Sequence, residues 1–259
     1  MLLMIYSDQR GTGTDISGPF VVLLNQYLLH PIRYNQRMAS KKPFDIDLVM
    51  GRLRLAVANV PKAAMFELAE LGFNTPFQQL VACLISVRTY DEVSLPVSRE
   101  LLLVARTPKE MVALSTDEID RIIRRSTFHE RKAVQIRAIA QRILDEFNGE
   151  LPCDGEVLQS FEGIGPKCAN LTLGIACGEP RVSADIHVHR VTNRWGYVHT
   201  STPERTSEVL EKILPEIYRV EINRLLVPFG KHICTGKLPR CSTCPVLEMC
   251  QQVGVDKHR

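Results

Sequence analysis

The chain has 259 residues, 45% hydrophobic and 24% charged, which is enough apolar material for one large domain or two small ones sharing an interface. Its net charge of +3 and isoelectric point near 8.4 are compatible with a nucleic-acid partner but do not indicate one. The apolar run 20–29 is too short to span a bilayer, and the N-terminus lacks the pattern of a secretory signal. We therefore expect a soluble, cytoplasmic protein.

Residues 1–42 differ in composition from the rest of the chain. They contain a stretch rich in Gly, Thr and Ser at 11–18, then the apolar run, then a basic stretch that ends at Lys41 and Lys42. No helical period persists for more than a couple of turns. We expect a poorly ordered tail; the alternative is that translation begins at Met38, which intact-mass measurement of the native protein would decide.

From Pro43 onward, apolar residues recur at helical spacing and strand-like alternation is missing, so the sequence predicts an all-α fold. The first helix is expected over 44–57. Ser/Thr caps followed three residues later by Gln or Glu predict helix starts; they occur at Thr75, Thr107 and Ser115. The longest helix is expected over 128–147, ended by Asn148-Gly149. Pro96 is expected in the first turn of its helix.

Residues 158–170 predict a helical hairpin. A short helix over 156–161 leads into Gly163-Ile164-Gly165, and a second helix begins near Pro166. Both glycines are expected to allow positive φ and close approach. The free N–H groups at the start of the second helix could then bind a phosphate. A plain helical corner with no ligand is the alternative.

Lys167 lies one residue into the second helix of this hairpin. It is a phosphate contact, a nucleophile whose amine is kept neutral by partial burial and the helix terminus, or a solvated basic residue.

Asp185 precedes another expected helix and can serve as its N-cap. A carboxylate there can also stabilise positive charge on a nearby sugar or accept a proton. His187, His189 and Arg190 follow it; phosphate contact or a surface position is more typical of them than metal binding.

Eight cysteines are present, four scattered singly at 83, 153, 168 and 177, and four in the pattern Cys234-x6-Cys241-x2-Cys244-x5-Cys250. Four thiolates in a compact stretch indicate an iron–sulfur cluster in a reducing compartment. Structural zinc is the alternative, but it usually takes two short Cys-x2–4-Cys pairs and only one is present. The first two ligands enclose a basic loop, from which Lys237 and Arg240 could contact phosphate.

The run Gly-Ile-Gly-Pro-Lys followed by Ser-Ala-Asp-Ile-His-Val-His-Arg-Val resembles the helix–hairpin–helix glycosylases of the endonuclease III family, and the resemblance extends over about residues 73–253. It implies a six-helix barrel over 69–179, an iron–sulfur domain formed by 43–68 and 180–259, and DNA in the cleft between them. It also implies that Lys167 attacks C1′ of the damaged nucleotide, that Asp185 assists, and that the four clustered cysteines bind a 4Fe-4S cluster with the family's spacing.

The resemblance further implies two wedges that fill the gap left by a flipped nucleotide. Arg88 matches the first wedge, where bacterial relatives often have glutamine, so the opposite-base preference is open. Phe128 matches the second, usually aliphatic; a core aromatic is the alternative.

The activity implied is that of a bifunctional glycosylase and AP lyase, which removes oxidised pyrimidines from damaged double-stranded DNA, acting as a monomer. The mismatch branch and the adenine branch are alternatives, but both generally lack the hairpin lysine, and the adenine branch has glutamate where Cys83 stands. A non-catalytic helix–hairpin–helix DNA-binding protein and a zinc-stabilised interaction module are the remaining alternatives.

Overall fold

The structure is a computed structural model that describes residues 41–259. Every regular element in this range is helical and none is a strand, which confirms the all-α prediction. The expectations for the tail and for Met38 fall outside the described residues. Within that range, no helix combines the length and the apolar character that crossing a bilayer requires.

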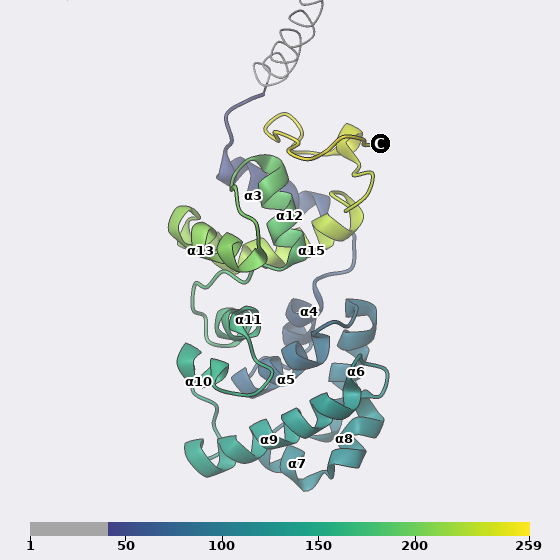
Figure 1. Ribbon diagram of the computed structural model, residues 1–259, viewed down its shortest axis with the longest axis vertical. Helices are drawn as coiled ribbons and strands as arrows, with labels where there is room; N and C mark the ends of the chain where they lie inside the picture. Colours follow the sequence, from purple (N-terminus) through teal and green to yellow (C-terminus); the bar gives the residue numbers. More distant parts are fainter. Residues whose placement is uncertain (1–40) are drawn as a thin grey trace, which may run out of the picture. The chain divides into compact units, whose positions relative to one another are not determined.

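One hydrophobic core is built from eight consecutive helices (Figure 1). These are α4 (Ala64–Glu70), α5 (Pro76–Ser86), α6 (Asp91–Val104), α7 (Pro108–Ala113), α8 (Thr116–Ile123), α9 (His129–Phe147), α10 (Gly155–Gln159) and α11 (Pro166–Ala176). Helix α5 is central, because all of residues 77–85 are buried and it packs against α6, α9 and α11. A helix buried on every side needs a mainly apolar sequence. The buried residues of α5 are apolar except Gln78 and Gln79, whose amides donate hydrogen bonds to backbone carbonyls.

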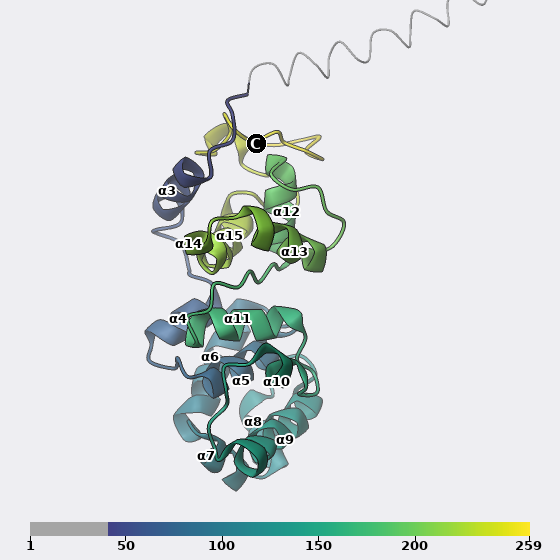
Figure 2. The ribbon, with the colours of Figure 1, turned by 90° about the vertical axis from the view of Figure 1, so that its left-hand side faces the viewer.

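A second core surrounds Trp195 and Phe229, whose ring centroids are 6.5 Å apart. Its helices are α3 (Ile46–Ala56), α12 (Ile186–Trp195), α13 (Pro203–Ile213), α14 (Glu216–Arg219) and α15 (Glu221–His232). Figure 2 shows α3 beside the C-terminal helices, and a hydrogen bond from Tyr218 Oη to Asp47 Oδ1 (2.7 Å) ties it there. The second core is therefore made from both ends of the described chain.

The two cores are joined within one compact unit, residues 42–259. Val227 of α15 is buried in the first core. Lys231, also on α15, forms an ion pair with Asp91 on α6, with 2.9 Å between Nζ and Oδ2. The predicted division into two domains, one of them discontinuous, stays a prediction.

The local signals for helix boundaries were mostly correct. All three predicted capping boxes are present, at Thr75 with Gln78, Thr107 with Glu110, and Ser115 with Glu118. In each, the hydroxyl and the longer side chain satisfy backbone N–H groups that the first helical turn leaves unpaired.

Two other boundary predictions had different outcomes. Helix α9 runs from His129 to Phe147 and is followed by Asn148 and Gly149 at φ +51° and +85°, as predicted. Pro96 is not in a first turn, however: α6 begins at Asp91 and Pro96 lies inside it. Proline lacks an N–H, so its place near the start of a helix leaves only one early carbonyl without a helical partner.

Candidate active site and cysteine loop

The hairpin turn between α10 and α11 depends on one glycine for its backbone conformation. Gly163 has φ +88°, and an added Cβ there would lie 2.8 Å from Nε2 of Gln135. Gly165 has φ −100° and is the N-cap of α11, so the prediction of positive φ was wrong for this glycine. Ile164 is buried in the first core, which leaves only its backbone to meet a phosphate.

Lys167 is the second residue of α11 and is exposed. It lines a pocket with two carboxylates, Asp91 and Asp185, together with Ser86 and Asn223. The pocket thus brings the two predicted catalytic residues together, and it draws them from α11 and from the start of α12.

A set of hydrogen bonds fixes the segment that carries Asp185 against α11. Ser183 Oγ donates to the carbonyl of Lys167 (3.0 Å), and Asn170 Nδ2 donates to the carbonyl of Val182 (2.9 Å). From the other side, Asn223 Nδ2 donates to the carbonyl of Ser183 (2.9 Å). The backbone between Val182 and Asp185 is therefore held between α11 and α15, which sets where the carboxylate lies.

Asp185 combines the two roles that its sequence position left open. Its Oδ1 accepts from the backbone N–H groups of His187 and Val188, both at 2.9 Å, so it caps α12. It also lines the pocket beside Lys167. Both of these hydrogen bonds engage Oδ1, so Oδ2 is the oxygen available for the pocket.

The pKa of Lys167 is raised above its usual value. Desolvation lowers this pKa, but the charges of Cys83, Cys168, Asp185 and Asp91 raise it, and the increase prevails. The structure thus favours the ammonium form of Lys167 in the free protein, not an amine kept neutral by burial. An amine that attacks carbon must first lose a proton, and the pocket offers two carboxylates that could accept it.

Asp91 is a pocket residue that the sequence did not reveal. It is the first residue of α6, followed by Glu92, and acidic residues are common in a first helical turn because they complement the helix dipole. Its pairing with Lys231 depends on α15, which lies 140 residues away in sequence. No local pattern could have indicated that contact.

Cys83 and Cys168 face each other beside the pocket, with 2.6 Å between their sulfur atoms. Both are buried, and the hydrogen bond between them, together with burial, raises the pKa of Cys168. The position where the adenine branch carries a glutamate is thus occupied by a thiol that meets another thiol. The carboxylate that the adenine branch has at this position is therefore missing at residue 83.

The remaining two scattered cysteines, Cys153 and Cys177, form a disulfide that brackets α10 and α11. Their pairing was not predicted. The partners are separated by 24 residues, and spacing alone does not show which cysteines meet.

The two predicted wedge residues lie close together and share a backbone conformation. Arg88 and Phe128 have φ +54° and +58°, in the left-handed region, and the Arg88 guanidinium carbon is 5.9 Å from the Phe128 ring centroid. Phe128 is 54% exposed, which excludes the alternative of a core aromatic.

His187 and Arg190 are engaged within the protein. Arg190 Nη2 donates to the carbonyl of Gly230 (2.9 Å) and lies 3.2 Å from Nδ1 of His187. Burial lowers the pKa of His187, in keeping with a neutral ring that accepts from Arg190. At Gly230 an added Cβ would lie 2.7 Å from His187 Nδ1, so α12 and α15 need glycine where they touch. A DNA contact by either side chain stays a prediction.

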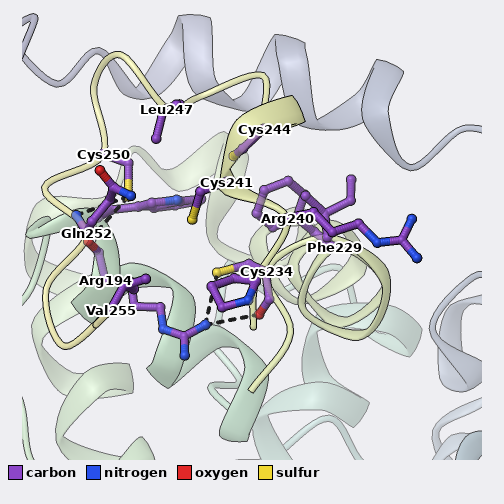
Figure 3. A pocket seen from close by; sticks show the side chains of 13 residues that line it. Arg194, Phe229, Cys234, Arg240, Cys241, Cys244, Leu247, Cys250, Gln252 and Val255 are labelled. Carbon is purple, nitrogen blue, oxygen red and sulfur yellow. Dashed lines mark hydrogen bonds between the residues drawn. The ribbon is translucent and has the colours of Figure 1, made fainter. Parts of the chain in front are cut away.

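The four clustered cysteines line one pocket at the C-terminal end of the chain (Figure 3). Two of their sulfurs accept hydrogen bonds, Cys234 from Arg194 Nη1 (3.5 Å) and Cys250 from the backbone N–H of Gln252 (3.4 Å). In the part of the chain that is described, no three His, Cys, Asp or Glu side chains could hold a single metal ion.

The basic loop between Cys234 and Cys241 is held in place by Arg194. Its guanidinium donates to the carbonyl of Thr235 (2.7 Å) and to the carbonyl of Gly236 (2.8 Å). Lys237 and Arg240 are both exposed on this loop. Both cations are therefore accessible, and their contact with phosphate stays a prediction.

A helical fold with a glycine hairpin, whose lysine shares a pocket with two carboxylates, defines a class: the helix–hairpin–helix DNA glycosylases. Comparison with known proteins specifies the family. The model of the HhH-GPD superfamily of base excision DNA repair proteins matches residues 81–216, and the chain belongs to this superfamily.

Individual relatives agree with this assignment. Endonuclease III of Thermotoga maritima is 36% identical over 176 residues, which cover 68% of this chain and 83% of that protein. A solved non-covalent endonuclease III–DNA complex has 26% identity and a TM-score of 0.68, covering 80% of this chain and 94% of the other. A trapped covalent endonuclease III–DNA intermediate has 28% identity and a TM-score of 0.64, covering 73% and 93%.

Proposed function

We propose that Lys167 is the nucleophile through which this DNA glycosylase and AP lyase of base excision repair acts, and that its substrates are oxidised pyrimidines in duplex DNA. The observation that carries the proposal is the shared pocket of Lys167, Asp185 and Asp91. An amine and a carboxylate that line one pocket are the two groups that covalent displacement at a sugar carbon requires.

The reaction follows from these groups. A carboxylate accepts the proton of the Lys167 ammonium, and the amine then bonds to C1′ while the base leaves with the electrons of the glycosidic bond and takes up a proton. Ring opening gives a Schiff base between Lys167 and C1′. Its positive charge acidifies the C2′ proton; removal of that proton expels the 3′ phosphate and cleaves the strand.

The lysine also separates this function from the alternatives. A monofunctional glycosylase activates water and stops at the abasic site, so it needs no amine at the hairpin. The adenine branch is further disfavoured by Cys83, which meets Cys168 instead of supplying a carboxylate. A non-catalytic DNA-binding protein gives no reason for an amine between two carboxylates.

The test is borohydride trapping of the Schiff base. Lys167→Gln should abolish the covalent protein–DNA adduct on a thymine glycol duplex and on an abasic-site duplex, while Lys109→Gln, an exposed lysine on α7, should trap as the unchanged protein does. Trapping that persists in Lys167→Gln would remove this residue as the nucleophile. A panel of duplexes with dihydrouracil, oxidised guanine and mismatched uracil then tests the substrate range.

We also propose that Cys234, Cys241, Cys244 and Cys250 hold a 4Fe-4S cluster. They line one pocket, and the hydrogen bonds to Cys234 and Cys250 are of the kind that stabilise cluster sulfurs. These thiolates would supply the four soft ligands that a 4Fe-4S cluster takes. Brown colour with broad visible absorption supports the cluster; a colourless, zinc-containing protein contradicts it.

DNA contacts complete the proposal. The backbone of the Gly163–Gly165 turn and the exposed Lys237 and Arg240 are suited to phosphates, which fix register without selecting sequence. Arg88 and Phe128 are suited to fill the gap in the base stack. We expect a monomer that works in the cytoplasm, at the nucleoid if the source is prokaryotic.

A further inference from the structure

Lys132 is a buried lysine for which the reaction described above has no use. It lies in the first turn of α9 and is 3% exposed. Among residues 41–259, no carboxylate lies within ion-pair distance of it. Desolvation lowers its pKa to about 8. Burying a cation without a carboxylate partner costs free energy. The groups that accept hydrogen bonds from Lys132 therefore show which part of the fold this residue stabilises.

All its hydrogen bonds reach the end of α5 and the loop that follows. Nζ donates to the carbonyl of Ile85 (2.7 Å), the carbonyl of Val87 (2.8 Å) and the hydroxyl of Thr89 (3.2 Å). Carbonyls at a helix C-terminus carry partial negative charge and have no partner in the helix. The ammonium therefore caps α5 from outside and holds the residues on both sides of Arg88.

The same network reaches the segment that carries Phe128. The Thr89 hydroxyl accepts a hydrogen bond from the backbone N–H of Thr127 (3.1 Å) as well as from Lys132. Lys132 itself lies one turn beyond Phe128, and its backbone N–H donates to the Phe128 carbonyl (3.1 Å). One buried side chain thus connects the two loops whose tips are Arg88 and Phe128.

Both tips need such support because their backbone is strained. A residue other than glycine at positive φ is strained, and it persists only where surrounding contacts enforce it. Arg88 and Phe128 are exposed, so their own side chains are not enclosed by the core. The enforcing contacts are those made by their neighbours to Lys132 and Thr89.

We infer that Lys132 is a positioning residue that holds Arg88 and Phe128 together as one preformed wedge for the base stack. The inference rests on the proposed function, in which these two side chains fill the space of a flipped nucleotide. A wedge built before DNA arrives has no ordering cost when it binds, which makes flipping more favourable. Lys132 does not line the pocket of Lys167, and its side chain donates hydrogen bonds only to the end of α5 and the loop that follows, so we expect it to act through the two loops.

The test compares two substrates that differ in their need for a wedge. One carries the lesion in a fully paired duplex; the other carries it in an unpaired bubble, where the nucleotide is already unstacked. Lys132→Met removes the charge and its donors but keeps the length of the side chain. Thr89→Val removes only the connecting hydroxyl and serves if Lys132→Met does not fold. Lys109→Met, exposed on α7, is the matched control.

In single-turnover assays, Lys132→Met should slow base removal from the paired duplex by about tenfold to a hundredfold, the scale on which small displacements of positioned groups lower rates. Thr89→Val should cause a smaller loss of the same kind. On the bubble, both variants should match the unchanged protein, as should Lys109→Met on both substrates. A 2-aminopurine beside the lesion should show slower unstacking only in the paired duplex.

An equal loss on both substrates would show a general structural defect and overturn the inference, as would unchanged rates on the paired duplex in both variants. These outcomes are separate from those that test the nucleophile. Lys167→Gln should be inactive on both substrates. If it still forms the Schiff base, the proposed nucleophile is wrong, while a duplex-specific loss in Lys132→Met would still support the wedge.

Discussion

Asp185 shows how one side chain can meet a structural and a chemical need. It caps α12 through Oδ1 and lines the pocket of Lys167. Asparagine is about as good an N-cap as aspartate, because its side-chain oxygen accepts the same hydrogen bonds. The substitution Asp185→Asn therefore removes the charge and keeps the cap.

Asp185→Asn should slow single-turnover base removal by about a hundredfold or more, the usual contribution of a positioned acid or base. DNA binding should remain nearly unchanged, and the melting temperature should shift little because the cap is kept. The matched control is Asp154→Asn: Asp154 caps α10 with bonds to the N–H groups of Glu156 and Val157, away from the pocket. Equal rates for Asp185→Asn and the unchanged protein would contradict the catalytic role.

At the scale of helices, the sequence predicted what depends on neighbours in the chain. Capping boxes at Thr75, Thr107 and Ser115 involve residues three positions apart, so their partners can be identified from the sequence itself. The hairpin and its lysine were identified for the same reason. Pro96 was misplaced because proline near a helix start is tolerated over several positions.

What could not be predicted depends on residues far apart in sequence. Asp91 enters the pocket through packing of α6 beside α15, and Lys132 caps α5 from α9. Asp91 and Lys132 each lie in the first turn of a helix, and a charged residue at such a position does not by itself indicate a distant partner. The same holds for the Cys153–Cys177 pairing, which depends on how α10 folds against α11.

That disulfide yields a prediction about the hairpin as an element. It closes a loop across 24 residues, which restricts the unfolded chain and should contribute about 3 kcal/mol to the free energy of unfolding. Cys153→Ser should lower the melting temperature, and a reducing agent should lower that of the unchanged protein by the same amount.

The double variant Cys153→Ser with Cys177→Ser provides the control. It should melt like the single variant and should not respond to the reducing agent, since the only disulfide of the described residues is gone. Base removal at a temperature where each protein is folded should be similar, because the disulfide lies at the outer ends of α10 and α11 and not at Lys167. A variant pair with unchanged melting would show that the bond does not form in solution.

For the whole molecule, a net charge of only +3 makes the placement of cations more important than their number. Lys237 and Arg240 are exposed on the loop within the cysteine pattern. The yellow C-terminal segment that carries this loop lies at the opposite end of residues 42–259 from α7 and α8 (Figures 1 and 2). If both contact phosphate, their joint replacement by alanine should reduce the slope of log affinity against log salt by about 2. Replacing Lys109 and Arg121, exposed on α7 and α8, should leave the slope unchanged.

If the proposed cluster is present, removal of its iron should reproduce this effect, because its ligands Cys234 and Cys241 lie at the two ends of the loop. In iron-depleted protein the cations remain but the loop is held only by the Arg194 hydrogen bonds, so the salt slope should fall as in the Lys237→Ala, Arg240→Ala variant. Depleting that variant should then change the slope no further. Schiff-base trapping at saturating protein should persist throughout, since Lys167 and its carboxylates lie in a separate pocket. If iron depletion and the double substitution lower the salt slope additively, the cysteine site also supports other DNA contacts.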